Sequence, residues 1–234
     1  MTQVSQCKLC LLQKELVNSH FLPASIYKLC RDAATGQNLI AVSQGVSKHT
    51  TDQIRDYVFC SDCEKRLNKN GEAWFHKNMA RPEGFTIQDA LEKATPSMIY
   101  DSFVAYEGSK IPGLDMDQIS YFGLSMFWRA AAHRWPALNA PGLRMERLLL
   151  GPCKESIRLF LLNGAPVPPH ISLLISVWPY KKKKPPPVVF NAPVGKRNQR
   201  LSLILVLHSR PRFQTSRRKR DLAQSYKYVG LRAT

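Results

Sequence analysis

The sequence predicts an α+β fold in three segments: a cysteine-rich unit over residues 1–80, a mainly helical region over 81–165, and a disordered tail over 166–234. Three observations lead to this prediction. Five of the six cysteines lie in the first segment, and apolar residues recur at three- and four-residue spacings in the second. The third segment is Pro-rich and then basic, a composition that does not build a packed core.

The first segment carries two Cys-x-x-Cys pairs, Cys7/Cys10 and Cys60/Cys63. A turn between two cysteines aims both sulfurs at one ion, and two such pairs complete the tetrahedral four-sulfur site that zinc prefers. Because 49 residues separate Cys10 from Cys60, folded structure between the pairs must close the site. We therefore expect structural zinc held by these four cysteines.

The remaining two cysteines, Cys30 and Cys153, are expected to be small buried hydrophobic residues. The second pair should begin a helix, because in "CSDCEKRLNKNGEAWFHK" Leu67 and Trp74 fall seven residues apart on one face.

The middle segment predicts a helix within residues 115–135, with one apolar face formed by Ile119, Phe122, Met126, Phe127 and Ala130. Asp115 or Asp117 should cap its N-terminus, and Pro136 should end it. A second helical stretch, interrupted at Gly151-Pro152, should run over 142–164, bury Ile157, Phe160 and Leu161, and stop at Gly164.

The net charge of +17 is concentrated at one end of the chain. Residues 1–180 hold 19 Lys and Arg against 16 Asp and Glu, whereas residues 181–234 hold 15 against the single acid Asp221. Such a polycation attracts phosphate backbones without reading sequence, and it is equally compatible with a solvated arm. Within this tail, "RLSLILVLH" predicts a short strand over 200–208.

No leading stretch has the pattern of a signal peptide, and the longest apolar runs, 171–178 and 201–207, are too short to span a bilayer. We therefore expect a soluble cytoplasmic protein with reduced thiols. The run "KKKKPPP" is also where a homopolymeric coding tract could have shifted frame, in which case the sequence after Tyr180 would not be the native continuation.

The motifs "SHFLP", at residues 19–23, and "CSDCEKRLNK", at 60–69, resemble the Cys-four branch of the HNH endonuclease superfamily. The resemblance covers about the first third of the chain and implies a treble-clef zinc-binding unit. It also implies a nuclease that hydrolyses DNA phosphodiester bonds with a catalytic Mg²⁺ or Mn²⁺ ion. His20 would be the general base, and Asn18, Glu64 and Asn68 would be the candidate ligands of the divalent ion.

The chain departs from the family pattern immediately before the histidine, where Ser19 replaces the usual metal-binding Asp or His. The Asn that orients the base in the family has only a loose counterpart in Asn38. The alternative hypothesis is a non-catalytic zinc-binding module that binds nucleic acid or a protein partner, with His20 packed as a structural residue. His76 and His133 are expected to be structural, and Arg129 solvated or salt-bridged. Nothing in the sequence specifies an oligomeric state.

Overall fold

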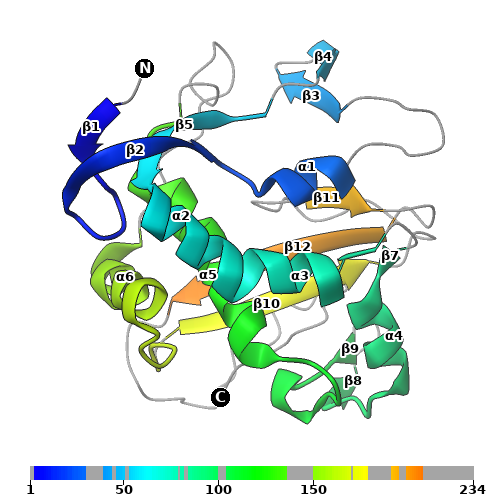
Figure 1. Cartoon of the computed structure of the whole chain (residues 1–234). Helices are drawn as coiled ribbons and strands as arrows, with labels where there is room; N and C mark the ends of the chain where they lie inside the picture. Colours follow the sequence, from blue (N-terminus) through cyan, green and yellow to red (C-terminus); the bar gives the residue numbers. More distant parts are fainter. Residues whose placement is uncertain are drawn as a thin grey trace.

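The computed structural model describes residues 3–29, 39–43, 46–50, 53–78, 80–81, 84–99, 104–135, 150–169, 171–178, 191–194 and 199–207. Helices and small antiparallel sheets alternate along these ranges, so the α+β prediction agrees with the structure. Figure 1 shows α5 at the centre, with the helix α2–α3 in front of it and strands β10 and β12 behind. Asn38, Cys30, Pro136, Tyr180 and residues 208–234 lie outside the described residues.

The N-terminal sheet consists of β1 (Gln3–Gln6), β2 (Gln13–His20) and β5 (Arg55–Cys60), in the antiparallel order β1-β2-β5. Strand β2 pairs Leu16 with Cys60 and His20 with Arg55. The register shifts between Val17 and Asn18, as at a β-bulge. This sheet therefore sets the end of β2, where His20 lies, against the start of β5.

A single long helix follows β5 without a loop, as the sequence predicts. It comprises α2 (Ser61–Leu67), a π-helical turn η1 (Asn68–Glu72) and α3 (Ala73–Asn78). Apart from Glu72, its buried positions recur every four residues, at Cys63, Leu67, Gly71 and Phe75. In an α-helix, positions four residues apart rotate gradually around the helix axis. The π turn contains more residues per turn and so keeps these positions on one face.

The π turn also changes which aromatic residue faces the core. Leu67 is fully buried, but Trp74, predicted to share its face, is only half-buried, and Phe75 takes the inward position. Phe75 stacks on Phe122 of α5 with ring centroids 3.9 Å apart. At Gly71 an added Cβ would lie 3.0 Å from the backbone N and Cα of Phe122, so this glycine permits the close approach of the two helices.

Helix α5 (Met116–Ala132) agrees with the predicted helix, and the Asp115 side chain accepts a hydrogen bond from the Gln118 N–H at 3.0 Å. The predicted single apolar face is wrong, however, because every residue from Ile119 to Ala131 is buried. A helix is buried on all sides when other elements surround it. Here the long helix, α6, β10 and β12 all pack against α5.

Helix α6 (Lys154–Asn163) follows a 3₁₀ turn η4 (Gly151–Cys153). The first part of the predicted helical stretch, 142–149, lies outside the described residues. Ile157, Phe160 and Leu161 are buried, and Gly164 ends the helix with φ 67°. Such a left-handed conformation favours glycine. Cys153 is buried, as expected.

Part of the segment predicted to be disordered is structured. Strands β10 (Ile171–Trp178), β12 (Gln199–Leu207) and β11 (Asn191–Val194) form an antiparallel sheet in the order β10-β12-β11. Strand β12 agrees with the strand predicted over 200–208. Ile171, Leu173 and Ile175 are buried at a spacing of two, which shows one face of β10 in the core. The composition of the whole segment obscured this short alternation.

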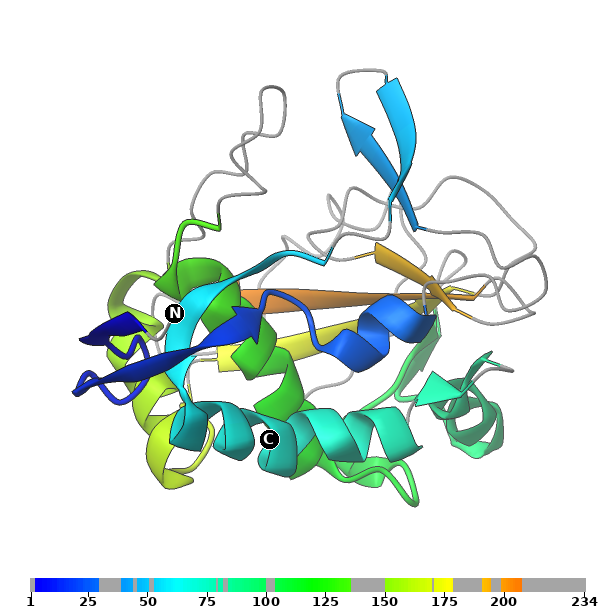
Figure 2. The ribbon, with the colours of Figure 1, turned by 45° about the horizontal axis from the view of Figure 1, so that its top comes forward.

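The shorter elements surround this frame. They are α1 (Ala24–Leu29), β3 (Leu39–Ser43), β4 (Val46–Thr50), β6 (Ala80–Arg81), β7 (Gly84–Phe85), α4 (Thr86–Lys93), β8 (Met98–Ile99), β9 (Val104–Ala105) and η2 (Gly108–Lys110). Figure 2 shows α1 and the hairpin β3–β4 on the side of the molecule where β2 ends. Among the described helices, none combines the length and the hydropathy needed to cross a membrane.

Candidate functional site

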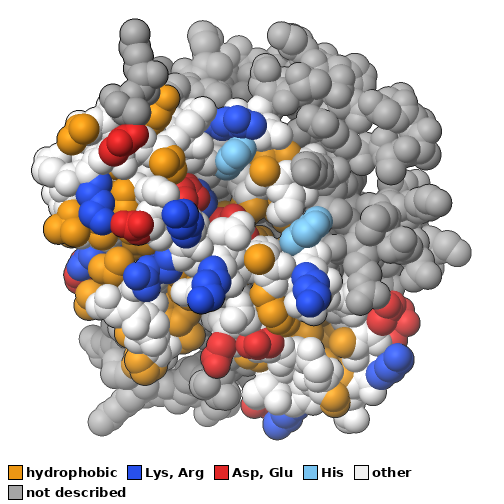
Figure 3. All heavy atoms as spheres, in the orientation of Figure 1, with side chains coloured by type: hydrophobic (Ala, Val, Ile, Leu, Met, Phe, Trp, Pro, Cys, Tyr) orange, Lys and Arg blue, Asp and Glu red, His pale blue; other side chains and the backbone are white. Residues whose placement is uncertain are grey.

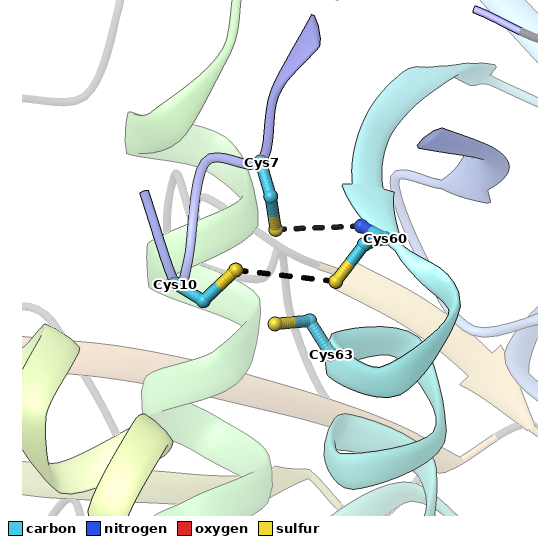
Figure 4. Close-up of side chains that lie close together, drawn as sticks. All are labelled: Cys7, Cys10, Cys60 and Cys63. Atoms are coloured by element: carbon cyan, nitrogen blue, oxygen red, sulfur yellow. Dashed lines mark hydrogen bonds between the residues drawn. The ribbon is translucent and has the colours of Figure 1, made fainter. Parts of the chain in front are cut away.

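The four paired cysteines come together in one cluster. Their sulfur atoms all lie within 4.8 Å of one another, and Figure 4 shows the sulfurs pointing toward a common centre. Cys7 and Cys10 lie in the turn between β1 and β2, Cys60 ends β5, and Cys63 lies in the first turn of α2. The sequence prediction that these four residues share one site agrees with this geometry.

Backbone hydrogen bonds shape the first cysteine turn. The Leu11 N–H donates to the Cys7 carbonyl at 2.9 Å, and the Cys7 N–H donates to the Leu12 carbonyl at 2.9 Å. Leu11 adopts the left-handed region, with φ 64°. The Cys60 N–H donates to Cys7 Sγ at 3.3 Å, and pairing of Leu16 with Cys60 brings the two pairs together across the intervening 49 residues.

The close approach of Cys7 and Cys63 shifts the pKa values of both thiols. A hydrogen bond from Cys63 lowers the pKa of Cys7 to about 4, and the same contact raises the pKa of Cys63. Only a cation would allow all four sulfurs to be thiolates at such short separations. Four sulfur ligands also leave no open coordination position, so the donor set fits structural zinc.

A second centre lies at the end of β2. A pocket of about 430 Å³ is lined by His20, Pro23, Ala24, Ser25, Glu64, Lys65, Asn68, Glu72 and Arg129. The structure thus brings together three of the four residues that the resemblance implies for catalysis, His20, Glu64 and Asn68. Asn18 does not line this pocket; it is exposed on β2 opposite Tyr57.

His20 is half-buried and held by a side chain that the sequence did not single out. Its Nε2 donates to Gln53 Oε1 at 2.8 Å, and Arg55 donates to the same oxygen at 2.6 Å. Burial and the charge of Arg55 lower the pKa of His20. The ring is therefore neutral near pH 7, and Nδ1 is its proton-accepting atom.

The floor of the pocket is a buried cluster of charges. Arg129 Nη1 donates to Glu64 Oε1 at 3.1 Å, and Nη2 donates to Glu64 Oε2 at 3.0 Å and to Glu72 Oε1 at 2.7 Å. Nη1 also donates to the backbone carbonyl of His20 at 2.7 Å. Arg129 is only 1% exposed, so the salt-bridged alternative for this residue agrees with the structure and the solvated one does not.

The two carboxylates respond differently to the shared guanidinium. Burial raises the pKa of Glu64, but the charge and hydrogen bonds of Arg129 outweigh burial and leave that pKa below its usual range. Burial raises the pKa of Glu72, and the neighbouring Glu64 adds to the effect, so the net pKa of Glu72 is raised. Glu64 is therefore the stronger ion-pair partner. Sequence reasoning missed Glu72, although an arginine within the apolar stretch "SMFWRAAA" signals a buried partner.

Ser19, which stands at the family's metal-binding position, has a structural role. It is 1% exposed, and its Oγ accepts a hydrogen bond from the Phe59 N–H at 3.2 Å. Its hydroxyl also lies 3.3 Å from the Val17 carbonyl. The Phe59 contact holds the bulged β2 against β5, and a hydrogen bond between the Ser19 side chain and Glu64 helps to lower the pKa of that carboxylate.

The donor set of the pocket does not fit a catalytic Mg²⁺ or Mn²⁺ ion. Such ions need several free oxygen ligands, usually including carboxylates. Both oxygens of Glu64 face Arg129, Asn18 lies outside the pocket, and Ser19 bonds to Phe59 and Glu64. Glu72 already binds Arg129 through one oxygen, and Asn68 bonds to Glu72, so these two residues do not supply enough free ligands. No chemical step through a divalent ion is therefore assigned to this pocket.

The exposed face of the long helix is basic. Lys65, Arg66, Lys69 and Lys77 are all exposed on it, and Figure 3 shows Lys and Arg side chains gathered over this part of the molecule. The exposed acid on the same helix, Asp62, is paired with Lys14 at 2.7 Å. Since Lys65 also lines the His20 pocket, the basic face and the pocket adjoin each other.

The other polar and aromatic candidates have structural positions. His133 Nε2 lies 2.6 Å from Asp56 Oδ2 just after α5 ends. His76 is exposed on α3. Trp128 and Trp135 are buried, and the Trp135 indole N–H donates to the Arg129 carbonyl at 2.9 Å.

Comparison of the chain with protein-family models, curated proteins and solved structures finds no match.

We predict that the four-cysteine cluster binds one zinc ion and that folding depends on it. Cys10→Ala should abolish stoichiometric zinc, measured by elemental mass spectrometry, and should lower the melting temperature steeply, because structural zinc supplies about 10–16 kcal/mol of binding free energy. Cys153→Ala is the matched control: it removes a buried thiol outside the cluster and should keep its zinc, with a loss of about 1 kcal/mol. Full zinc in Cys10→Ala would contradict the assignment.

We further predict that Glu64→Gln destabilises the protein at pH 7 by about 2–3 kcal/mol, whereas Glu72→Gln costs less than about 1 kcal/mol. The lowered pKa of Glu64 means that its stabilisation is present above its unfolded value of 4.5 and is lost as pH falls through the folded pKa. The raised pKa of Glu72 has the opposite sign, because ionisation of Glu72 opposes folding.

Urea unfolding of both variants between pH 7 and pH 4 tests this ordering. The gap between the variants should be widest near pH 7 and should narrow toward acid. The difference between variants is the quantity to follow, because acid also releases zinc from all proteins compared. Equal losses at pH 7 would contradict the unequal roles of the two carboxylates.

Proposed function

We propose that the protein is a zinc-stabilised module that binds the phosphate backbone of nucleic acid, probed first with DNA, through the exposed face of the helix 61–78. The observation that carries this proposal is the basic face formed by Lys65, Arg66, Lys69 and Lys77. Its one exposed acid is already paired with Lys14, so the face keeps a local excess of positive charge. Such a surface binds phosphates electrostatically and with little sequence preference.

The proposal includes zinc in a treble-clef arrangement. A cysteine turn in a hairpin, followed by a cysteine pair at a helix N-terminus, is the outline of that fold, and β1–β2, β5 and α2 supply these parts. In this arrangement the ion anchors the helix that carries the basic face. Loss of zinc would therefore remove nucleic-acid binding through loss of structure.

The affinity of this face for DNA should fall as the salt concentration rises. Replacing Lys65, Arg66, Lys69 and Lys77 with Ala should weaken binding to a short DNA duplex and reduce the slope of log K against log salt. The reduction should be about 0.9 for each phosphate that the variant no longer neutralises. Fluorescence anisotropy at several salt concentrations measures both quantities.

A matched variant with an equal change in charge controls for the basic tail, which adds to binding in every protein compared. It replaces Lys93, Lys110, Arg134 and Lys154, which are exposed on other parts of the chain, with Ala. This variant should keep most of the wild-type slope. The same slope for both variants would show that the helix face is not the binding surface.

The second candidate function is the HNH-like nuclease that the sequence resembles. It is favoured by the convergence of His20, Glu64 and Asn68 on one pocket beside the basic face. A phosphodiester bound along the helix would lie close to the neutral ring of His20, whose Nδ1 can accept a proton from water. Lys65 would supply positive charge near the phosphate. Against this candidate stand the engagement of Glu64 by Arg129 and of Ser19 by Phe59.

A supercoiled-plasmid nicking assay separates the two candidates. If the pocket is catalytic, zinc-loaded wild type should nick DNA, and His20→Ala should lose that activity by at least about 100-fold, the usual contribution of a general base. His76→Ala, which removes an exposed histidine from the helix that carries the basic face, should keep the activity. Parallel reactions with Mg²⁺, with Mn²⁺ and with neither ion are needed. Binding without nicking in any of them would leave the non-catalytic module as the function.

A further inference from the structure

The surroundings of Arg129 have the composition of a cation site. Four oxygen atoms lie 2.7–3.1 Å from its two terminal nitrogens: the His20 carbonyl, both oxygens of Glu64 and one oxygen of Glu72. They come from three places in the fold, the end of β2, helix α2 and the π turn η1. Two carboxylates and a carbonyl are the kind of donors that hard divalent cations bind.

The guanidinium that fills this site is permanent and fixed. Burial opposes its charge, but Glu64 and Glu72 outweigh burial and raise the pKa of Arg129 further, so it stays protonated at every physiological pH. Its Cζ lies 5.3 Å from the centre of the Phe59 ring. The Arg129 backbone is held as well, because Trp135 donates to its carbonyl. A mobile surface arginine has none of these constraints.

A guanidinium and a divalent ion cannot occupy this oxygen set together. The planar guanidinium already faces both oxygens of Glu64. A divalent ion bound to the same oxygens would lie close to this positive charge and be repelled by it. The guanidinium also binds one oxygen of Glu72 and the His20 carbonyl, so each of the four oxygens already has a cationic partner.

We propose that Arg129 is a built-in cation that takes the place of a divalent ion beside His20. On this proposal the wild-type pocket binds no Mg²⁺ or Mn²⁺, and whatever the pocket does is independent of these ions. Removing the guanidinium while keeping the two glutamates should convert the same oxygens into a site for a divalent cation. The inference goes beyond the proposed function, because it holds whether the pocket only binds phosphate or also cleaves it.

The test uses zinc-loaded full-length protein and Mn²⁺ as the probe. The proteins are wild type, Glu64→Gln, Arg129→Met, and Arg129→Met combined with Glu64→Gln and Glu72→Gln. Methionine keeps much of the side-chain volume without charge. Thermal unfolding and the electron paramagnetic resonance signal of free Mn²⁺ are measured across a Mn²⁺ titration.

We expect Arg129→Met to melt below wild type, because it leaves two carboxylates buried without a partner. Mn²⁺ at about 100 times its Kd should raise the melting temperature of this variant by roughly 5–10 °C. Wild type and the triple variant should show no shift and no Mn²⁺ uptake. If Arg129→Met folds only when Mn²⁺ is added, that result supports the proposal as well.

Two results would overturn it. Uptake of Mn²⁺ by wild type that disappears in Glu64→Gln would show that an ion can displace the guanidinium. A folded Arg129→Met that takes up no Mn²⁺ would show that the oxygens do not form a cation site. If Arg129→Met is insoluble under all conditions, the wild-type and Glu64→Gln titrations still decide whether the native pocket excludes the ion.

Discussion

The ion-pair cluster around Arg129 is a buried polar contact that joins the cysteine-rich unit to the helical region. Arg129 comes from the central helix α5, whereas its partners come from β2 and from the long helix that follows β5. A charge with 1% exposure is tolerated only when its partners are also fixed. The stacking of Phe75 on Phe122 and the close approach at Gly71 hold the same two helices at the required distance.

Two sites fix the first eighty residues of the chain: the cysteine cluster and the guanidinium of Arg129. The four sulfurs of the cysteine cluster are placed to bind a metal ion, which would tie the hairpin β1–β2 to the start of α2. The oxygens at the end of β2 already have a guanidinium, which ties the same helix to α5. Sulfur ligands suit zinc and oxygen ligands suit a hard cation or arginine, so the two centres do not compete for the same ion.

This arrangement places the pocket between a neutral histidine and a basic helix face. His20 is held by Gln53 and is the proton-accepting side chain of the pocket, and Lys65 and Asn68 connect the pocket to the face. The proposed phosphate-backbone partner would use both features. Because Arg129 engages both oxygens of Glu64, the proposal of binding has stronger support than that of metal-dependent cleavage.

The sequence by itself determined the parts whose signals are local. The two Cys-x-x-Cys pairs, a cap at Asp115 or Asp117, the Gly164 stop and the strand within 200–208 each depend on residues a few positions apart. All agree with the structure, which selects Asp115 as the cap. Only the tertiary structure decided the rest. The one-residue shift from Trp74 to Phe75 follows from a π turn, and the burial of α5 on all sides follows from what packs around it. The partnership of Arg129 with Glu64, Glu72 and His20 joins residues up to 109 positions apart, and a free energy that depends on such distant neighbours leaves no short-range pattern in the chain.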